Sequence, residues 1–241
     1  MKKKVLVWML SVCMVLTMMP LTTFANTEGG EPEAQTLSDT TVATIGSAEY
    51  ETLQEAIGAV KNGETITIVK DGIAENVTVP QAPDVKITID GAGKSFTGTI
   101  TVNGKSQAYA TAGLIIKNVK FDAGVISKDA CINMGGSDNI RYISNLAVQD
   151  CSFANGNKVK VGIKSYTGGD KNLVITGCSA NGMHSLVQLP NVAGVQVEDC
   201  TVTGCKNGIS AGKSSGVVIS NSVISTDGYG RSEERPCRER V

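Results

Sequence analysis

Five short segments of this chain share one pattern and recur at regular spacing. In each segment the first and third positions are aliphatic, the fifth is Asn, Asp or Gly, and the eighth is apolar. The segments are LIIKNVKF from Leu114, LAVQDCSF from Leu146, LVITGCSA from Leu173, VQVEDCTV from Val195 and VVISNSVI from Val217. Their starts lie 32, 27, 22 and 22 residues apart. A period in this range indicates a stacked repeat architecture.

The alternation within each segment selects the kind of stack. Alternating apolar residues predict a short strand with one buried face, and the small fifth residue predicts a bend before a second strand. One unit alone cannot bury its apolar face, so the units must stack as parallel strands about 4.8 Å apart. A second apolar column follows the first, at Ile132, Ile163, Val187 and Ile209. The pattern therefore predicts an all-β parallel β-helix, or solenoid.

This repeat resembles the right-handed parallel β-helix proteins of the pectin-lyase-like superfamily, of the bacterial secreted or surface type. In that family asparagine or aspartate recurs at one tight turn, as Asn118, Asp150, Asp199 and Asn221 do here. The resemblance covers about residues 65–225 and concerns the fold pattern, not a catalytic motif. It implies a right-handed coil.

The segment before the first repeat predicts a short capping helix at about 52–62. Thr52-Leu53-Gln54-Glu55 matches a capping box, and Gly63 can end the helix. The apolar face consists of Leu53, Ala56, Ile57 and Val60. The run YETLQEAIGAVKNGETITIV also resembles the start of many bacterial surface β-helices, where such a helix covers the first coil. The predicted coils are 65–84, 85–113, 114–145, 146–172, 173–194, 195–216 and an unfinished one from Val217.

The two ends of the chain lie outside the predicted β-helix domain at 43–230. Residues 1–25 combine three lysines, an apolar run and a small-residue cleavage site, which is typical of a secretory signal peptide. The apolar run is shorter than the about 20 residues that a membrane-spanning helix needs. Residues 26–42 are predicted to be a flexible leader. Residues 231–241, RSEERPCRERV, are expected to be a non-native tail, with a charged disordered tail as the alternative. The natural chain is then expected to continue beyond Gly230, so that the β-helix is truncated at its C-terminus.

Charge and hydropathy limit the classes of partner that the exported chain is expected to bind. Without signal and tail, 15 basic and 20 acidic residues leave a net charge near −5. A mildly acidic chain without a basic run argues against nucleic acid, and no later segment is apolar enough to span a membrane. The predicted location is secreted or at the cell surface. The predicted partner is an extracellular polysaccharide or a host or cell-wall surface.

The five cysteines of the predicted domain follow the repeat rather than a disulfide pattern. They are Cys131, Cys151, Cys178, Cys200 and Cys205. Cys151, Cys178 and Cys200 occupy the sixth repeat position and predict a buried ladder of small side chains. A disulfide between stacked neighbours, or between Cys200 and Cys205, remains the alternative. The thiols have no CxxC spacing and no adjacent histidine, so we assign no metal site and no cofactor.

Several residues invite a catalytic interpretation, and none is assigned a catalytic role. Asp150 and Asp199 would lie about 10 Å apart, near the carboxyl separation of an inverting glycosidase, yet their column is first a turn column. Gly91–Ser95 lacks the first glycine of a phosphate loop and is interpreted as a turn. His184, the only histidine, is interpreted as a surface residue. The remaining candidates are Arg141 as a base and Tyr109, Tyr142 and Tyr166 as a sugar-stacking surface.

The function expected from the sequence is a non-catalytic β-helix module, adhesin-like or structural and in contact with glycan. The superfamily's hydrolases carry NTD, DD, GHG and RIK segments, and none of these occurs here. Arg141 has no aspartate cluster beside it in the sequence, as the resemblance to the lyases would require. The alternative is the N-terminal part of a polysaccharide lyase or glycoside hydrolase whose active site is missing or unrecognised.

Overall fold

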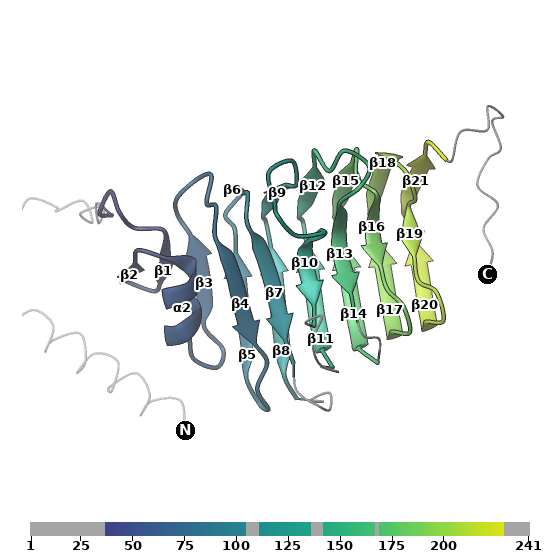
Figure 1. The fold of residues 1–241 in the computed structure, drawn as a ribbon. Helices are drawn as coiled ribbons and strands as arrows, with labels where there is room; N and C mark the ends of the chain where they lie inside the picture. The colour runs from purple at the N-terminus through teal and green to yellow at the C-terminus, as the bar shows by residue number, and fades with distance from the viewer. Residues whose placement is uncertain (1–36, 105–110, 136–141, 167–168, 229–241) are drawn as a thin grey trace, which may run out of the picture. The chain divides into compact units, whose positions relative to one another are not determined.

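A computed structural model describes residues 37–104, 111–135, 142–166 and 169–228. These residues form a right-handed parallel β-helix of about six turns with one short helix near the N-terminus (Figure 1). The predicted fold class is confirmed. The chain passes through three sheets in each coil, and each sheet consists of strands from successive coils.

Sheet A has nine strands and contains the first half of every repeat segment. Its spatial order is β2 (Ala48–Tyr50), β1 (Ala43–Ile45), β3 (Thr65–Ile68), β5 (Lys86–Asp90), β8 (Gly113–Lys117), β11 (Ser144–Gln149), β14 (Lys171–Thr176), β17 (Ala193–Glu198) and β20 (Ser215–Ser220). The β1 strand is antiparallel to both β2 and β3, whereas all the later pairs are parallel.

Sheets B and C complete each coil with six strands each. Sheet B contains β6 (Ser95–Phe96), β9 (Lys120–Asp122), β12 (Ser152–Ala154), β15 (Ser179–Asn181), β18 (Thr201–Cys205) and β21 (Val223–Thr226). Sheet C contains β4 (Asn76–Pro80), β7 (Thr99–Asn103), β10 (Ala130–Met134), β13 (Val161–Ser165), β16 (Ser185–Gln188) and β19 (Ile209–Ser210).

The strand register reproduces the alignment that the sequence predicts. In sheet A one column of paired residues runs through Leu114, Leu146, Leu173, Val195 and Val217. In sheet C the second predicted column pairs Ile132, Ile163, Val187 and Ile209. Residues one period apart in the sequence are therefore direct neighbours across the sheets. Both columns face the interior of the coil.

The third interior column, in sheet B, begins with three phenylalanines. The rings of Phe96 and Phe121 meet edge to face with centroids 5.7 Å apart, and those of Phe121 and Phe153 stack at 5.1 Å. Ala180 and Val202 continue the column in the next two coils. Aromatic pairs of this geometry add to the stabilisation that burial of their surface provides.

The predicted turn column joins sheet A to sheet B. All five of its residues adopt the left-handed backbone conformation, with φ between 47° and 64°: Asn118, Asp150, Gly177, Asp199 and Asn221. This region suits Gly, Asn and Asp best, which explains why only these residue types occupy the column.

The N-terminal end of the stack is covered by α2 (Leu53–Ala59) and by β1. The capping box forms as predicted, with Thr52 Oγ1 accepting from the Glu55 N–H at 3.1 Å and the Thr52 N–H donating to Glu55 Oε2 at 3.2 Å. The Gln54 side chain bonds both backbone groups of Thr78 and so occupies the open edge of β4. The exposed edge strand expected at a solenoid end is thus paired here.

The helix is shorter than the predicted range 52–62 and does not end at Gly63. Val60 adopts an extended conformation and packs against the core, so the helix stops at Ala59. Gly63 serves the following turn instead, where its φ is +84° and its N–H donates to Lys86 O at 2.7 Å. Thr41 and Val42, at the end of the predicted leader, are buried.

The last described coil leaves its core-facing residues exposed. Val217 and Ile219 in β20 are 36% and 47% exposed, whereas Ile175 in the same column as Ile219 is fully buried. Among the described strands, none pairs with the outer edge of β20. The core-facing columns of sheet A are therefore buried in the middle of the stack and partly exposed at its last described coil.

We predict that Ile175→Asp prevents folding, because an unpaired carboxylate in the core costs several kcal/mol, comparable with the whole stability of a domain. The matched control is Ile219→Asp, which we expect to fold with a loss of about 1 kcal/mol. Circular dichroism and thermal unfolding of the soluble fractions measure both. A soluble Ile175→Asp variant that unfolds cooperatively would contradict the register.

Candidate functional site

The cysteine column is an interior feature, as the sequence predicts. Cys151, Cys178 and Cys200 lie on successive coils, since Ser179 N donates to Cys151 O and Thr201 N to Cys178 O, each at 2.9 Å. All five cysteines of the domain are buried and free. The neighbouring Cys151 thiol chiefly, and burial in addition, raise the pKa of Cys178 to about 12. A thiol with so high a pKa is a poor nucleophile.

The acidic residues of the turn column serve the turn. Asp150 and Asp199 are both exposed and in the left-handed conformation, and Gly177 lies between them in the column. A Cβ on Gly177 would lie 2.3 Å from Asp150 Oδ1, so the carboxylate occupies the space above the glycine. In the coil before, Asn118 donates to Asp90 Oδ1 at 3.0 Å. The structure thus supports the turn interpretation of this column.

Gly91–Lys94 form a turn between β5 and β6, in agreement with the turn predicted for Gly91–Ser95. Ala92 and Gly93 have φ of +48° and +75°, and the Ala92 N–H donates to Asp90 Oδ1 at 2.9 Å. No helix follows this turn, because β6 begins at Ser95.

A second left-handed column lies at the second residue of β11, β14, β17 and β20 in sheet A, and it was missed by the sequence interpretation. It contains Asn145, Asn172, Gly194 and Gly216, with φ between 52° and 70°. The Asn172 amide donates to Asn145 Oδ1 at 2.9 Å, and the Asn145 amide donates to Ala112 O at 2.7 Å. The signal was present in the sequence, since Asn or Gly directly precedes the first aliphatic residue of each of these repeats.

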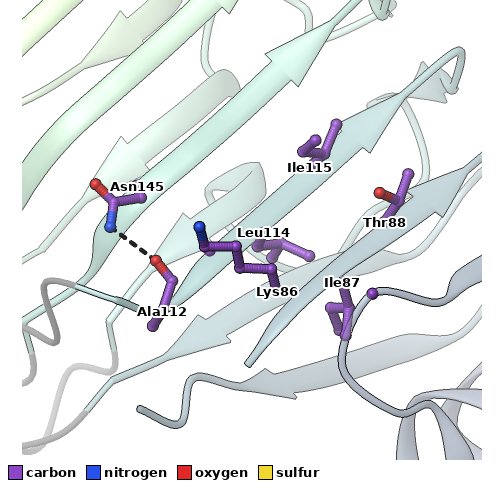
Figure 2. A pocket seen from close by; sticks show the side chains of 9 residues that line it. Lys86, Ile87, Thr88, Ala112, Leu114, Ile115 and Asn145 are labelled. Atoms are coloured by element: carbon purple, nitrogen blue, oxygen red, sulfur yellow. Dashed lines mark hydrogen bonds between the residues drawn. The ribbon is translucent and has the colours of Figure 1, made fainter. Parts of the chain in front are cut away.

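A shallow pocket of about 440 Å³ lies on the outer face of sheet A, between β5 and β8. Its lining residues are Gly63, Lys86, Ile87, Thr88, Ala112, Gly113, Leu114, Ile115 and Asn145. Figure 2 shows Lys86 among them, beside the hydrogen bond from Asn145 to Ala112. Gly113 leaves room for Lys86, whose Cγ would lie 3.2 Å from a Cβ at that position. The pocket offers one ammonium group and no acid–base pair.

A column of cationic residues runs along the corner between sheets B and C. The pairs Val161–Ser185 and Val187–Ile209 place Lys160, His184 and Lys206 at equivalent positions of three successive coils. The backbone confirms this order, since the His184 N–H donates to Lys160 O at 2.6 Å. All three side chains are half-buried.

Further charged and polar groups surround this column. Lys164 on β13 pairs with Asp129 at 3.1 Å, and its ammonium lies 4.6 Å from the centroid of the Tyr166 ring. Burial first, and then Lys206 and Lys164, lower the pKa of His184. The sequence interpretation treated His184 as an isolated surface residue. The spacing of 24 and 22 residues to its neighbours, which matches the repeat, could have revealed the column.

Of the other residues singled out in the sequence, the structure describes only two tyrosines. Arg141 and Tyr109 lie outside the described residues. Tyr142 packs over Gly169, where a Cβ would lie 2.3 Å from its ring, and Tyr166 lies beside Lys164. In the described parts of the chain, no three His, Cys, Asp or Glu residues are placed to hold a metal ion. No described helix is long and apolar enough to cross a membrane.

Asp170 is a buried carboxylate at the corner between sheets C and A. Its Oδ1 accepts the Ile143 N–H at 2.7 Å, and its Oδ2 lies 2.6 Å from Ser165 Oγ. Burial raises the pKa of Asp170, while these two hydrogen bonds act in the opposite direction. The carboxyl group takes the place of a backbone carbonyl as the acceptor for the Ile143 N–H, so the role of Asp170 is structural.

The comparisons with known proteins leave the class of protein to be defined by its fold. No protein-family model, curated protein or solved structure matches this chain. The geometry described above therefore places the chain among parallel β-helix proteins and assigns it to no narrower family.

We predict that the five buried thiols resist alkylation in the native protein, because they are out of contact with solvent. Iodoacetamide labelling near pH 8 followed by peptide mapping should modify them only after denaturant is added. Rapid modification of Cys178 in the folded protein would contradict its position in the interior.

Asp170→Ala is expected to lower the free energy of unfolding by about 1–3 kcal/mol, since Ile143 N–H loses its acceptor. Asp170→Asn keeps both hydrogen bonds and is expected to be tolerated. Because the folded pKa of Asp170 is raised, its favourable contribution is complete at acid pH and is lost as pH rises through that pKa. Chemical denaturation at several pH values should show the wild type losing stability relative to Asp170→Asn as pH rises. The opposite trend would refute the assignment.

Proposed function

We propose that this chain is a secreted or cell-surface β-helix module without catalytic activity, adhesin-like or structural, that contacts extracellular polysaccharide. The observation that carries the proposal is the use of outer polar side chains as links between coils. Asn172 bonds Asn145, Asn118 bonds Asp90, and Asn181 donates to Thr203 Oγ1 at 2.9 Å.

Such links favour a scaffold over a catalyst. General acid–base catalysis needs titratable groups that converge on one reacting atom. The two carboxylates of the turn column, Asp150 and Asp199, are instead two coils apart, and Asp90 is paired with Lys117 at 3.1 Å. A stack in which every coil is bonded to the next keeps its outer faces in fixed positions, which suits repeated contact with a long polymer.

The finer family assignment is part of the same proposal. The right-handed coil, the helical cap and the asparagine and aspartate turns all support membership of the pectin-lyase-like superfamily. The basic, apolar and small-residue order of residues 1–25 supports export. Fold alone does not assign a function, so the activity needs a direct test.

The test incubates purified mature protein with pectin, polygalacturonate and neutral glycans, each with and without calcium. We expect no unsaturated product and no new reducing ends, and we expect retention on at least one insoluble polysaccharide. Product formation would overturn the non-catalytic proposal in favour of a lyase or hydrolase. Asp150→Asn and Asp199→Asn would then show whether the turn carboxylates are responsible.

A further inference from the structure

We propose that Lys160, His184 and Lys206 form an anion-binding column that holds acidic groups of a polysaccharide, with an affinity that increases as the pH falls. The proposal rests on the glycan contact proposed above. It adds the site, the chemical class of the ligand and its regulation by protons.

The coil geometry determines the spacing of the column. Neighbouring coils are about 4.8 Å apart, so Lys160 and Lys206 lie about 10 Å apart along the stack. A polymer that runs across the coils would meet a cationic position on each of three coils. Contacts that repeat along one polymer reinforce one another, because each contact after the first is intramolecular.

The charge of the column is unusual for this chain. The exported part is net acidic, near −5, yet cations gather at this corner. Lys164 lies on the adjacent strand β13, and Lys160 Nζ donates to Lys128 O at 2.7 Å. The carboxylates at this corner are engaged, as Asp129 pairs with Lys164 and Asp227 with Lys158. Like charges that are held together and half-buried repel one another, and a bound anion relieves that repulsion.

His184 gives the column its proton dependence. Its Nε2 lies 3.4 Å from the Asn207 amide nitrogen and its Nδ1 lies 3.4 Å from Ser185 Oγ. The cations that face the ring are Lys164 from β13 and Lys206 from the turn after β18, and both disfavour its protonation. An anion on the column favours the imidazolium. The bound state therefore has the higher histidine pKa, and affinity must increase as pH falls.

The ligand class follows from these groups. The cations require carboxylate, sulfate or phosphate groups, and the amides of Asn207 and of Gln188, on the adjacent strand, can bond sugar hydroxyls. An acidic polysaccharide combines both chemistries at a regular repeat. Carboxylate and sulfate are alternative sources of the same charge, and the experiment separates them.

The test measures binding of polygalacturonate, dextran sulfate and neutral dextran by calorimetry at about pH 5 and about pH 7.5. We expect one or both acidic polymers to bind and dextran not to bind. Dextran sulfate reports the pH dependence most directly, because its own groups do not titrate in this range. Its affinity should be several-fold higher at the lower pH.

Variants separate the column from net charge. Lys160→Gln with Lys206→Gln should weaken binding by about tenfold, on the order of a few-fold for each half-buried cation. The matched control, Lys70→Gln with Lys213→Gln, removes the same charge from exposed positions outside the column and should bind as the wild type does. His184→Gln should weaken binding at the lower pH and remove the pH dependence. Thermal unfolding confirms that each variant is folded.

Each contrary result has a definite meaning. Equal losses in both double-lysine variants would refute the column, as would a pH dependence that persists in His184→Gln. Duplex DNA bound as tightly through the same residues would refute the glycan assignment. Binding of neutral glycans that is unaffected by these variants would refute the column and leave the proposed function standing. Binding of no glycan at all would overturn both.

Discussion

The hydrogen-bond ladder between successive coils is the interaction on which the rest of this structure depends. A single coil leaves the N–H and C=O groups of its three strands unpaired and its apolar side chains exposed. Parallel pairing with the next coil satisfies the backbone and places like side chains above one another. The columns of Leu173 and Val195, of Phe121 and Phe153, and of Cys178 and Cys200 all follow from this one arrangement.

The same arrangement organises the outside of the coil. Positions that point outward also recur once in each turn, so polar residues form columns as apolar residues do. Two of these columns hold the left-handed turns, where asparagine side chains join one coil to the next. A third gathers Lys160, His184 and Lys206, although nothing in the total charge of the chain suggests it. In a solenoid, the charge of each outer column is therefore a better guide to binding than the net charge of the whole chain.

The fold was largely predictable because the period is visible in the sequence. The segments beginning at Leu146, Leu173 and Val195 established the register, and Thr52 with Glu55 established the cap. Other features depend on contacts between residues that no period relates. The helix ends early because Val60 turns into the core. Asp170 is buried because its carboxylate accepts the hydrogen bond of the Ile143 N–H.

The candidate site was less predictable than the fold, for a physical reason. His184 looked isolated when its immediate sequence neighbours were considered, yet its relevant neighbours lie 24 residues before and 22 residues after it. Net charge sums over all faces and hides a local excess of cations. Function in this architecture depends on residues that become adjacent only after coiling.

The corners absorb differences in coil length. Seven residues join Asp122 in β9 to Ala130 in β10, whereas three join Asn181 in β15 to Ser185 in β16. Both connections nevertheless deliver the chain to the same column of sheet C. A corner of this kind can therefore accept grafted loops while the sheets on either side keep their pairing. Lineages of such proteins can diversify in the same way, by lengthening a corner without rebuilding the stack.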